Sequence, residues 1–275
     1  AAGASSETVI AIGDVHGDFD ILARALYKAN IMNRDGHWIA SNTMVIQVGD
    51  LLDGGGRDMG DATDNYREEI DILMLIEHLN KQASAEGGAF LNLIGNHELM
   101  NVMGDFRHVT KSGIEGLGGE SKRKQLFQPG GPLAKRLGCS SYGICKIGDW
   151  TFVHGGILPK HLKNKSFSIQ NINNMVQDIL TGFRKKEQLN SDEKDLIFGD
   201  NNIFWTRQLS DPSPNCTVVN ESIKLLNNGI QKGGIVVGHT VQNNINQKCG
   251  NGGGGGVWRI DKGMSRAFGK KYPRD

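Results

Sequence analysis

The amino-acid sequence predicts an α/β fold in which parallel strands are covered by helices. Two observations predict it: short, nearly unbroken apolar runs recur along the 275 residues, and helical stretches separate the first three runs. The resulting order of strand, helix, strand, helix and strand is typical of a parallel sheet. Because the carboxyl ends of parallel strands face the ligand crevice, we expect the residues that follow each run to converge.

Each predicted strand is rich in apolar side chains and stops at a polar segment that contains glycine. The near absence of polar alternation indicates that these strands are buried on both faces. The predicted strands cover residues 8–12, 43–48, 89–94, 150–153, 234–237 and 257–260. The predicted helices between the first three strands cover residues 20–31 and 65–82.

Three other segments complete the predicted organisation of the chain. Residues 160–202 are polar and helical, and we interpret them as an insertion or cap on a single domain that spans residues 1–275. The glycine- and charge-rich residues 111–124 predict a mobile surface loop. The glycine run at 251–256 predicts a hairpin tip between two strands, not a phosphate cradle.

Composition narrows the classes of function and partner. The formal net charge is +1, and no apolar run reaches the length of a membrane span, so we expect neither nucleic acid nor a membrane as a partner. The four cysteines fit neither a zinc pattern nor a disulfide scaffold, which predicts reduced thiols. We therefore expect a cytoplasmic protein, although the first residues, AAGASSE, are compatible with a removed targeting segment.

Side chains that can bind a divalent metal ion follow five of the predicted strands. Carboxylate oxygens, amide oxygens and imidazole nitrogens are all suitable ligands. A lone aspartate or asparagine after a strand is usually a turn or capping residue, but turn chemistry alone does not explain five successive cases. The candidates are Asp14, His16, Asp50, Asp53, Asn96, His97, His154 and His239.

Five short motifs at these positions resemble the signature series of calcineurin-like metallophosphoesterases, nearest to their phosphoprotein phosphatase branch. They are GDVHG (13–17), GDLLD (49–53), GNHE (95–98), HGG (154–156) and GH (238–239). Longer stretches, GNHELMNVMGDFRHV, FWTR and DKGMSRAFG, resemble the bacterial-type, Shewanella-like phosphatases. The resemblance runs from about residue 8 to 269. It implies a four-layer α/β/β/α sandwich of two mixed sheets.

Carried over by position, the resemblance implies two divalent transition-metal ions about 3–4 Å apart. Manganese is the favoured metal, with iron and zinc as alternatives. A water shared by the two cations would lose its proton near neutral pH and attack phosphorus in line. The implied ligands are Asp14, His16 and Asp50 for one ion, and Asn96, His154 and His239 for the other, with Asp50 as the bridge.

Two further residues are assigned to the leaving group. His97 follows a ligand, and we interpret it as the general acid that protonates the leaving oxygen. Asp53 would hydrogen-bond the other ring nitrogen of His97, orient the imidazole and favour its protonated form. Structural roles for both, as a capping neighbour and a loop residue, are the alternative.

The residues that would bind the phosphate are less defined. The family usually has an arginine directly after its second aspartate, but this position is Gly54 here, and an arginine appears only at Arg57. Either the glycines let the loop bend so that Arg57 reaches the phosphate, or Arg107 and Arg207 bind it instead.

The predicted function is a metal-dependent phosphomonoester hydrolase that acts on phosphoproteins. The subgroup resemblance favours phosphotyrosine or dual specificity, whereas the parent branch favours phosphoserine and phosphothreonine. One alternative is a hydrolase of dinucleoside polyphosphates or RNA caps, which calls for stacking aromatic residues that the sequence does not clearly supply. Another alternative is a non-catalytic metal-binding module, which the change at Gly54 motivates.

Overall fold

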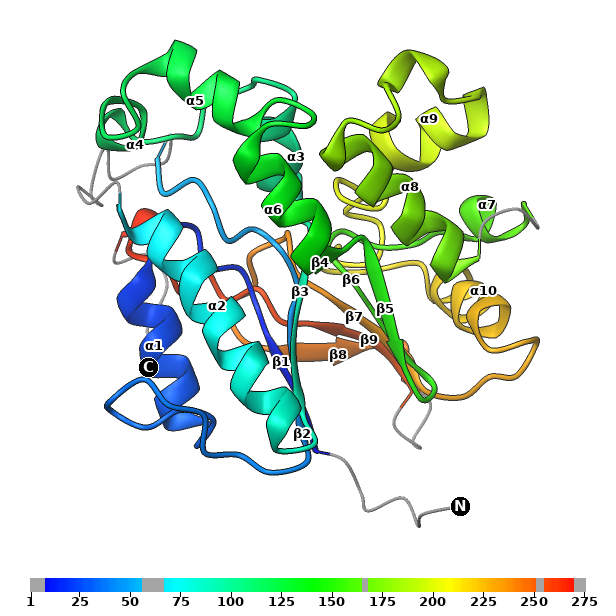
Figure 1. Ribbon diagram of the computed structural model, residues 1–275. Coiled ribbons are helices and arrows are strands. Elements are labelled where there is room, and N and C mark those ends of the chain that lie inside the picture. The colour runs from blue at the N-terminus through cyan, green and yellow to red at the C-terminus, as the bar shows by residue number, and fades with distance from the viewer. Residues whose placement is uncertain (1–7, 56–66, 165–167, 251–254, 270–275) are drawn as a thin grey trace.

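Two β-sheets form the centre of the molecule, with helices on the outer side of each (Figure 1). The structure is a computed structural model that describes residues 8–55, 67–164, 168–250 and 255–269. The first sheet has the order β1-β2-β3-β4, and its paired strands are parallel. These strands are β1 (Thr8–Ile12), β2 (Thr43–Gln47), β3 (Ala89–Leu93) and β4 (Ser141–Tyr142).

The second sheet is mixed and has the order β5-β6-β7-β9-β8. Its three inner strands run parallel, whereas the two edge strands are antiparallel to their neighbours. The resemblance implied two mixed sheets, and this is wrong for the first sheet, which is parallel. Helical crossovers connect its strands, so that each strand runs in the same direction as the one before it. The strands of the second sheet are β5 (Ile144–Ile147), β6 (Trp150–Val153), β7 (Gly234–Val237), β8 (Asn246–Lys248) and β9 (Gly256–Arg259).

The sheets pack face to face, and the alternation of buried side chains along β2 shows which side of the first sheet contacts the second. Val45 faces the helix side, whereas Ile46 faces the second sheet, where it joins a cluster with Phe152 and Val236. Helices α1 (Phe19–Lys28) and α2 (Arg67–Ala85) lie on the first sheet, and α8 (Ile169–Thr181) and α10 (Cys216–Leu226) pack on the second. This arrangement confirms the four-layer α/β/β/α fold.

Local sequence explains why α1 begins and where it packs. The Asp18 side chain accepts a hydrogen bond from the Ile21 backbone N–H at 3.2 Å and so caps the helix. Ile21, Leu22 and Leu26 recur at helical spacing and are all buried. The cap directs the chain from the polar tip after β1 back across the sheet.

Residues 111–124 are a correction, because the structure has two helices where we predicted a mobile surface loop. Helix α4 (Lys111–Glu115) begins after Thr110, whose side chain accepts from the Gly113 N–H, and α5 (Glu120–Phe127) follows it. Arg123 of α5 is fully buried. The charged side chain marks an interior ion-pair network here, and not a solvated surface.

The segment around residues 160–202 is helical within its described residues, as predicted, and α9 lies beside α8 in Figure 1. Its role as an insertion or cap stays a prediction. No helix in the described ranges is both long and apolar enough to cross a membrane. The further helices are α3 (Asn96–Val102), α6 (Pro132–Ser140), α7 (Pro159–Leu162) and α9 (Ser191–Phe198), with 3₁₀ turns at η1 (Lys186–Gln188) and η2 (Arg266–Phe268).

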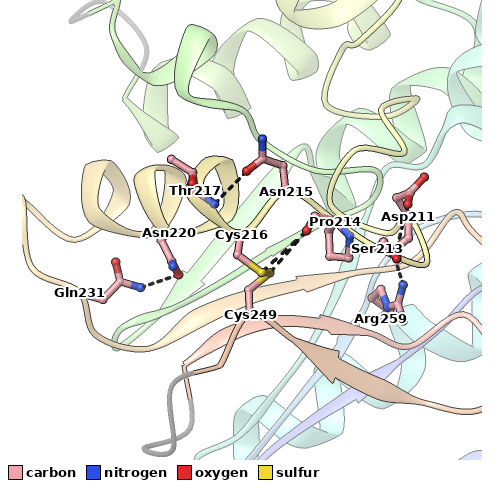
Figure 2. The surroundings of a disulfide bond; sticks show 10 residues. All are labelled: Asp211, Ser213, Pro214, Asn215, Cys216, Thr217, Asn220, Gln231, Cys249 and Arg259. Atoms are coloured by element: carbon pink, nitrogen blue, oxygen red, sulfur yellow. Dashed lines mark hydrogen bonds between the residues drawn. A yellow bond between two sulfur atoms is a disulfide. The ribbon is translucent and has the colours of Figure 1, made fainter.

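The cysteines are a second correction. Cys216 at the start of α10 and Cys249 after β8 form a disulfide, so the prediction of reduced thiols is wrong for this pair (Figure 2). The fold places their Cα atoms 5.1 Å apart although 33 positions separate them in sequence. Disulfides persist in oxidising compartments, so this bond does not favour the predicted cytoplasmic location.

Replacing Cys216 by serine is expected to lower the free energy of unfolding by about 3–4 kcal/mol, because the bond closes a loop of 33 residues. Urea denaturation of the purified variant measures this loss. Cys139→Ser is the matched control, because Cys139 is exposed and is not part of a disulfide. Equal stability of the two variants would show that the bond adds nothing to the fold.

Candidate metal centre

The structure brings together all six residues that the resemblance implied as metal ligands. Each follows the carboxyl end of a strand, as the parallel topology predicted, and each is buried. Their roles as ligands stay a prediction. They are Asp14 and His16 after β1, Asp50 after β2, Asn96 after β3, His154 after β6 and His239 after β7.

Asp50 lies at the centre of this cluster. Its Oδ2 atom is 3.7 Å from His16 Nε2 and 3.3 Å from His154 Nε2. Two groups of potential ligand atoms contain Asp50, one with His16 and His97 and the other with His154 and His239. The atoms within each group lie within 4.8 Å of one another. A carboxylate that belongs to both groups is suited to bridge two cations.

Backbone carbonyls orient the three histidines of the implied ligand set. In each ring one nitrogen contacts a carbonyl oxygen, which leaves the other nitrogen for the centre of the cluster. Histidines that bind metals are held in this way in proteins. The contacts are His16 Nδ1 to Leu52 O (3.3 Å), His154 Nδ1 to Val48 O (2.9 Å) and His239 Nε2 to Trp205 O (3.1 Å).

The surroundings of the Asp14 carboxylate show whether the cluster fits a cation. Its Oδ2 accepts a hydrogen bond from the His239 N–H at 3.0 Å, but its buried Oδ1 has no hydrogen-bond partner within the described part of the chain. Burial raises the pKa of Asp14, and the nearby carboxylates of Asp261 and Asp50 raise it further. A divalent cation would satisfy the bare oxygen and offset the like charges, so these residues fit a metal ion.

Neighbouring charges also set the protonation of the other candidate ligands. Burial alone would raise the pKa of Asp50, but His154 and His97 hold it well below its usual value. Burial lowers the pKa of His239, and His154 and Arg207 lower it further, so this imidazole is neutral and can act as a ligand. Burial opposes the charge on His154, but Asp50 raises its pKa to about 10, so a metal ion has to displace a proton to bind this ring.

Glu98 holds the segment that carries Asp50. Its two carboxylate oxygens accept hydrogen bonds from the backbone N–H groups of Asp50, Leu51 and Leu52 at 2.9–3.0 Å. They also accept from Gly95 at 2.7 Å, which ties this loop to the start of α3. Glu98 was not singled out from the sequence, although it ends the GNHE motif that was quoted there.

Two glycines permit the close approach of the carboxylates. A Cβ atom on Gly95 would lie 2.2 Å from Asp50 Oδ1, and one on Gly238 would lie 2.3 Å from Asp14 Oδ1. Several site residues adopt the backbone conformation that non-glycine residues rarely use, which is common at functional sites. They are His16, Asp50, Asp53 and His239, with φ angles of 45°, 56°, 68° and 65°.

The second predicted pair, Asp53 and His97, is also in contact. His97 Nδ1 lies 2.9 Å from Asp53 Oδ2, and Asp53 Oδ1 accepts a hydrogen bond from Asn101 Nδ2 at 2.8 Å. The other ring nitrogen, His97 Nε2, lies 3.9 Å from Asp50 Oδ2. This geometry matches a general acid that an aspartate orients, and the catalytic roles themselves stay a prediction.

A pocket of about 400 Å³ opens onto the cluster. His97 and Asp50 line it together with Trp205, which is 37% exposed. Trp205, from the FWTR stretch, therefore forms part of the pocket wall. Five further residues that line the pocket were not singled out from the sequence, although three of them lie in the stretches quoted for the resemblance; they are His108, Thr240, Val241, Asp261 and Phe268.

The three arginines proposed for phosphate binding lie in different surroundings. Arg207 lines the pocket, with Nη1 3.4 Å from Thr240 Oγ1. Arg107 does not line that pocket: its side chain is 70% exposed and forms an ion pair with Asp105 at 2.6 Å. Arg57 falls outside the described residues. Of the two arginines within the described residues, the geometry therefore favours Arg207 over Arg107 for contact with a phosphate.

Arg207→Ala is expected to lower kcat/KM on a phosphopeptide roughly 10- to 100-fold, which corresponds to one lost charge-assisted hydrogen bond of about 1.5–3 kcal/mol. Arg107→Ala should stay within about twofold of the parent protein, because an exposed surface ion pair contributes little. Steady-state kinetics of the two variants side by side measures both. A larger loss in Arg107→Ala would reverse the assignment.

The fold and the site together define a class of protein. Two sheets in an α/β/β/α sandwich bring carboxylate, amide and imidazole groups that can bind metal ions together around one central aspartate, and this arrangement fits a metal-dependent phosphoesterase. The family comparison agrees: residues 7–243 match the model of the family described as calcineurin-like phosphoesterase. The chain belongs to this family, and it is therefore a metal-dependent hydrolase of phosphate esters.

The relatives of this chain narrow the resemblance further. It is similar to Shewanella-like protein phosphatase 2 of Arabidopsis thaliana, with 29% identity over 97% of this chain and 74% of that protein. Shewanella-like protein phosphatase 1 of Plasmodium berghei is 27% identical over 96% of this chain and 70% of that protein. A solved cold-active protein tyrosine phosphatase superposes with a TM-score of 0.76 and 25% identity, covering 94% of this chain and 70% of that one. The predicted resemblance to Shewanella-like phosphatases is confirmed.

Proposed function

We propose that this protein is a protein phosphatase that holds two divalent cations, with manganese as the favoured metal. The observation that carries the proposal is the position of Asp50, which belongs to two groups of ligand atoms and lies beside the His97–Asp53 pair. The proposed ligands are Asp14, His16 and Asp50 for one cation, and Asp50, Asn96, His154 and His239 for the other. Because the proposed ligands come from both sheets, we also propose that residues 1–275 form a single domain.

The protein's own residues perform three tasks in this proposal. Arg207 donates hydrogen bonds to the phosphoryl oxygens at the pocket wall. His97 presents Nε2 to the pocket and donates a proton to the leaving oxygen, while Asp53 fixes its Nδ1. When bound, the cations would supply charge neutralisation at the phosphoryl group and an acidified water. Trp205 contributes to the pocket wall next to His239, with ring centroids 5.5 Å apart.

A neighbouring pocket supports a phosphoprotein as the substrate. Its volume is about 420 Å³, and Trp205 lines both this pocket and the one over the cluster. Its apolar lining includes Met100 and Met103, from α3 and its end, and Ile197 and Phe198, from α9. A peptide that carries a phosphorylated residue can place a neighbouring apolar side chain here, whereas a small phosphate ester leaves the pocket unused.

Manganese-supplemented assays on three substrates test the proposal: a phosphotyrosine peptide, a phosphoserine/phosphothreonine peptide and diadenosine tetraphosphate. We expect a phosphopeptide to give the highest kcat/KM, with phosphotyrosine favoured. Preference for the dinucleotide would instead support a nucleotide hydrolase in which Trp205 stacks on a base. Absence of turnover on every substrate, in protein shown to bind manganese, would support the non-catalytic binding module and end the proposal.

A further inference from the structure

The buried guanidinium of Arg123 lies next to the proposed catalytic pair but has no part in metal or phosphate binding as described above. Arg123 belongs to α5, in the segment that the sequence predicted as a surface loop, and its side chain is 0% exposed. A buried arginine is costly unless negative or polar groups surround it. Its partners therefore indicate what this charge does inside the protein.

The Arg123 side chain donates hydrogen bonds through Nε and Nη1, whereas its buried Nη2 has no hydrogen-bond partner among the described residues and makes an ion-pair contact only. Nε donates to Asn101 Oδ1 at 2.8 Å, and Nη1 donates to Glu69 Oε2 at 2.9 Å and to the Gly113 carbonyl at 3.2 Å. Nη2 lies 3.5 Å from Asp53 Oδ1. The Phe127 ring lies under the guanidinium, 4.8 Å from it to the ring centroid. These contacts fix the planar group in position and orientation.

The two hydrogen-bonded side chains both hold Asp53. Asn101 Nδ2 donates to Asp53 Oδ1 at 2.8 Å and to the His97 carbonyl at 2.9 Å. Glu69 Oε1 accepts from the Asp53 backbone N–H at 2.8 Å, at a residue whose φ angle is 68°. Arg123 is thus connected by hydrogen bonds to the backbone of Asp53 through Glu69 and to its carboxylate through Asn101, and it forms an ion pair with the same carboxylate at 3.5 Å.

We propose that Arg123 is a positioning residue that acts through Asp53, holding its carboxylate so that Asp53 Oδ2 remains on His97 Nδ1. This inference rests on the proposed phosphatase function and adds a residue from α5 to it. The guanidinium lies beside Asp53 Oδ1 at 3.5 Å, whereas Asp53 Oδ2 contacts the histidine at 2.9 Å. A purely structural role, in which Arg123 neutralises two buried carboxylates, makes no difference to which phosphate esters the enzyme can cleave.

The leaving group separates these two roles. An aryl phosphate with an acidic phenol, such as 4-nitrophenyl phosphate, leaves without a proton donor, whereas the alkoxide of a phosphoserine peptide needs one. Arg123→Lys keeps the charge but removes the planar fork. We expect it to lose at least about tenfold more kcat on the phosphoserine peptide than on 4-nitrophenyl phosphate, as a fraction of the full general-acid effect of roughly 10²–10⁴.

Arg136→Lys is the matched control, because Arg136 pairs with Glu77 at the partly exposed surface of the neighbouring helix α6. This variant should have the same kcat as the parent protein on both substrates. Asp53→Asn supplies the second half of a double-variant cycle: if Arg123 acts through Asp53, then Arg123→Lys should add no further selective loss in that background. Circular dichroism and metal content establish that each variant is folded and loaded.

If the Arg123 variant does not fold, Asn101→Ala tests the same connection with Arg123 left in place, and it should show the same selectivity for the leaving group. Equal losses on both substrates, or fully additive losses in the cycle, would overturn the inference while the phosphatase proposal stands. If the parent protein cleaves no phosphate ester at all, the proposed function fails and this inference fails with it.

Discussion

Asp50→Asn is expected to bind fewer than two metal ions per chain and to lose roughly 10³-fold or more in turnover. Asp50 is the shared member of both ligand groups, and an amide offers one neutral oxygen where a bridge needs two charged ones. Elemental analysis of the purified variant, followed by kinetics in excess manganese, measures both effects. The loop itself should persist, because Glu98 binds the backbone of residue 50 and not its side chain.

A control at Asp195 separates this effect from a general loss of acidic residues. Asp195 forms a surface ion pair with Lys160 at 2.6 Å, and its side chain is 47% exposed. Asp195→Asn should keep the metal content and turnover of the parent protein. If Asp50→Asn also retained two ions and full turnover, the bridging role would be wrong.

His97→Ala should leave the metal content intact and lower turnover on phosphoserine peptides by roughly 10²–10⁴, the usual contribution of a general acid. The structure predicts this split because Asp53 holds Nδ1 at 2.9 Å while Nε2 faces the pocket at 3.9 Å from Asp50. His37→Ala, at an exposed position, is the control and should have no effect. Loss of metal together with turnover in His97→Ala would instead make His97 a ligand.

The strand ends of the site could be predicted because their signal is local. The apolar run of β1 stops just before Asp14, and the run of β2 stops just before Asp50. Parallel pairing then places such residues at one edge whatever the details of the connections. The short strands β4 and β8 carry no comparable signal, because two or three residues are too few to show a period.

Arg123 could not be predicted, because its burial depends on partners far away in the sequence. Glycines and charges in residues 111–124 are typical of an exposed loop. Only the fold shows that Glu69 and Asp53 need a cation at this place. An interior charge network is decided by tertiary contacts, which composition does not contain.

The disulfide could not be predicted for the same reason, because it too depends on residues that are far apart in the sequence. Cys216 and Cys249 match no spacing pattern, and they meet because α10 packs against the sheet that carries the β8–β9 hairpin. The antiparallel pairing of β8 with β9 agrees with the hairpin predicted around residues 251–256, although residues 251–254 lie outside the described ranges. Arg57, in the loop after Asp53, also lies outside the described ranges, so its contact with the phosphate stays a prediction.

The most direct test of the account is an anomalous scattering map from crystals grown with manganese. Two peaks should lie at Asp50, one beside Asp14 and His16 and the other beside the ligands from the remaining strands. A map without metal density at these side chains, or with one ion that Asp50 does not contact, would contradict the dinuclear centre on which the proposed function depends.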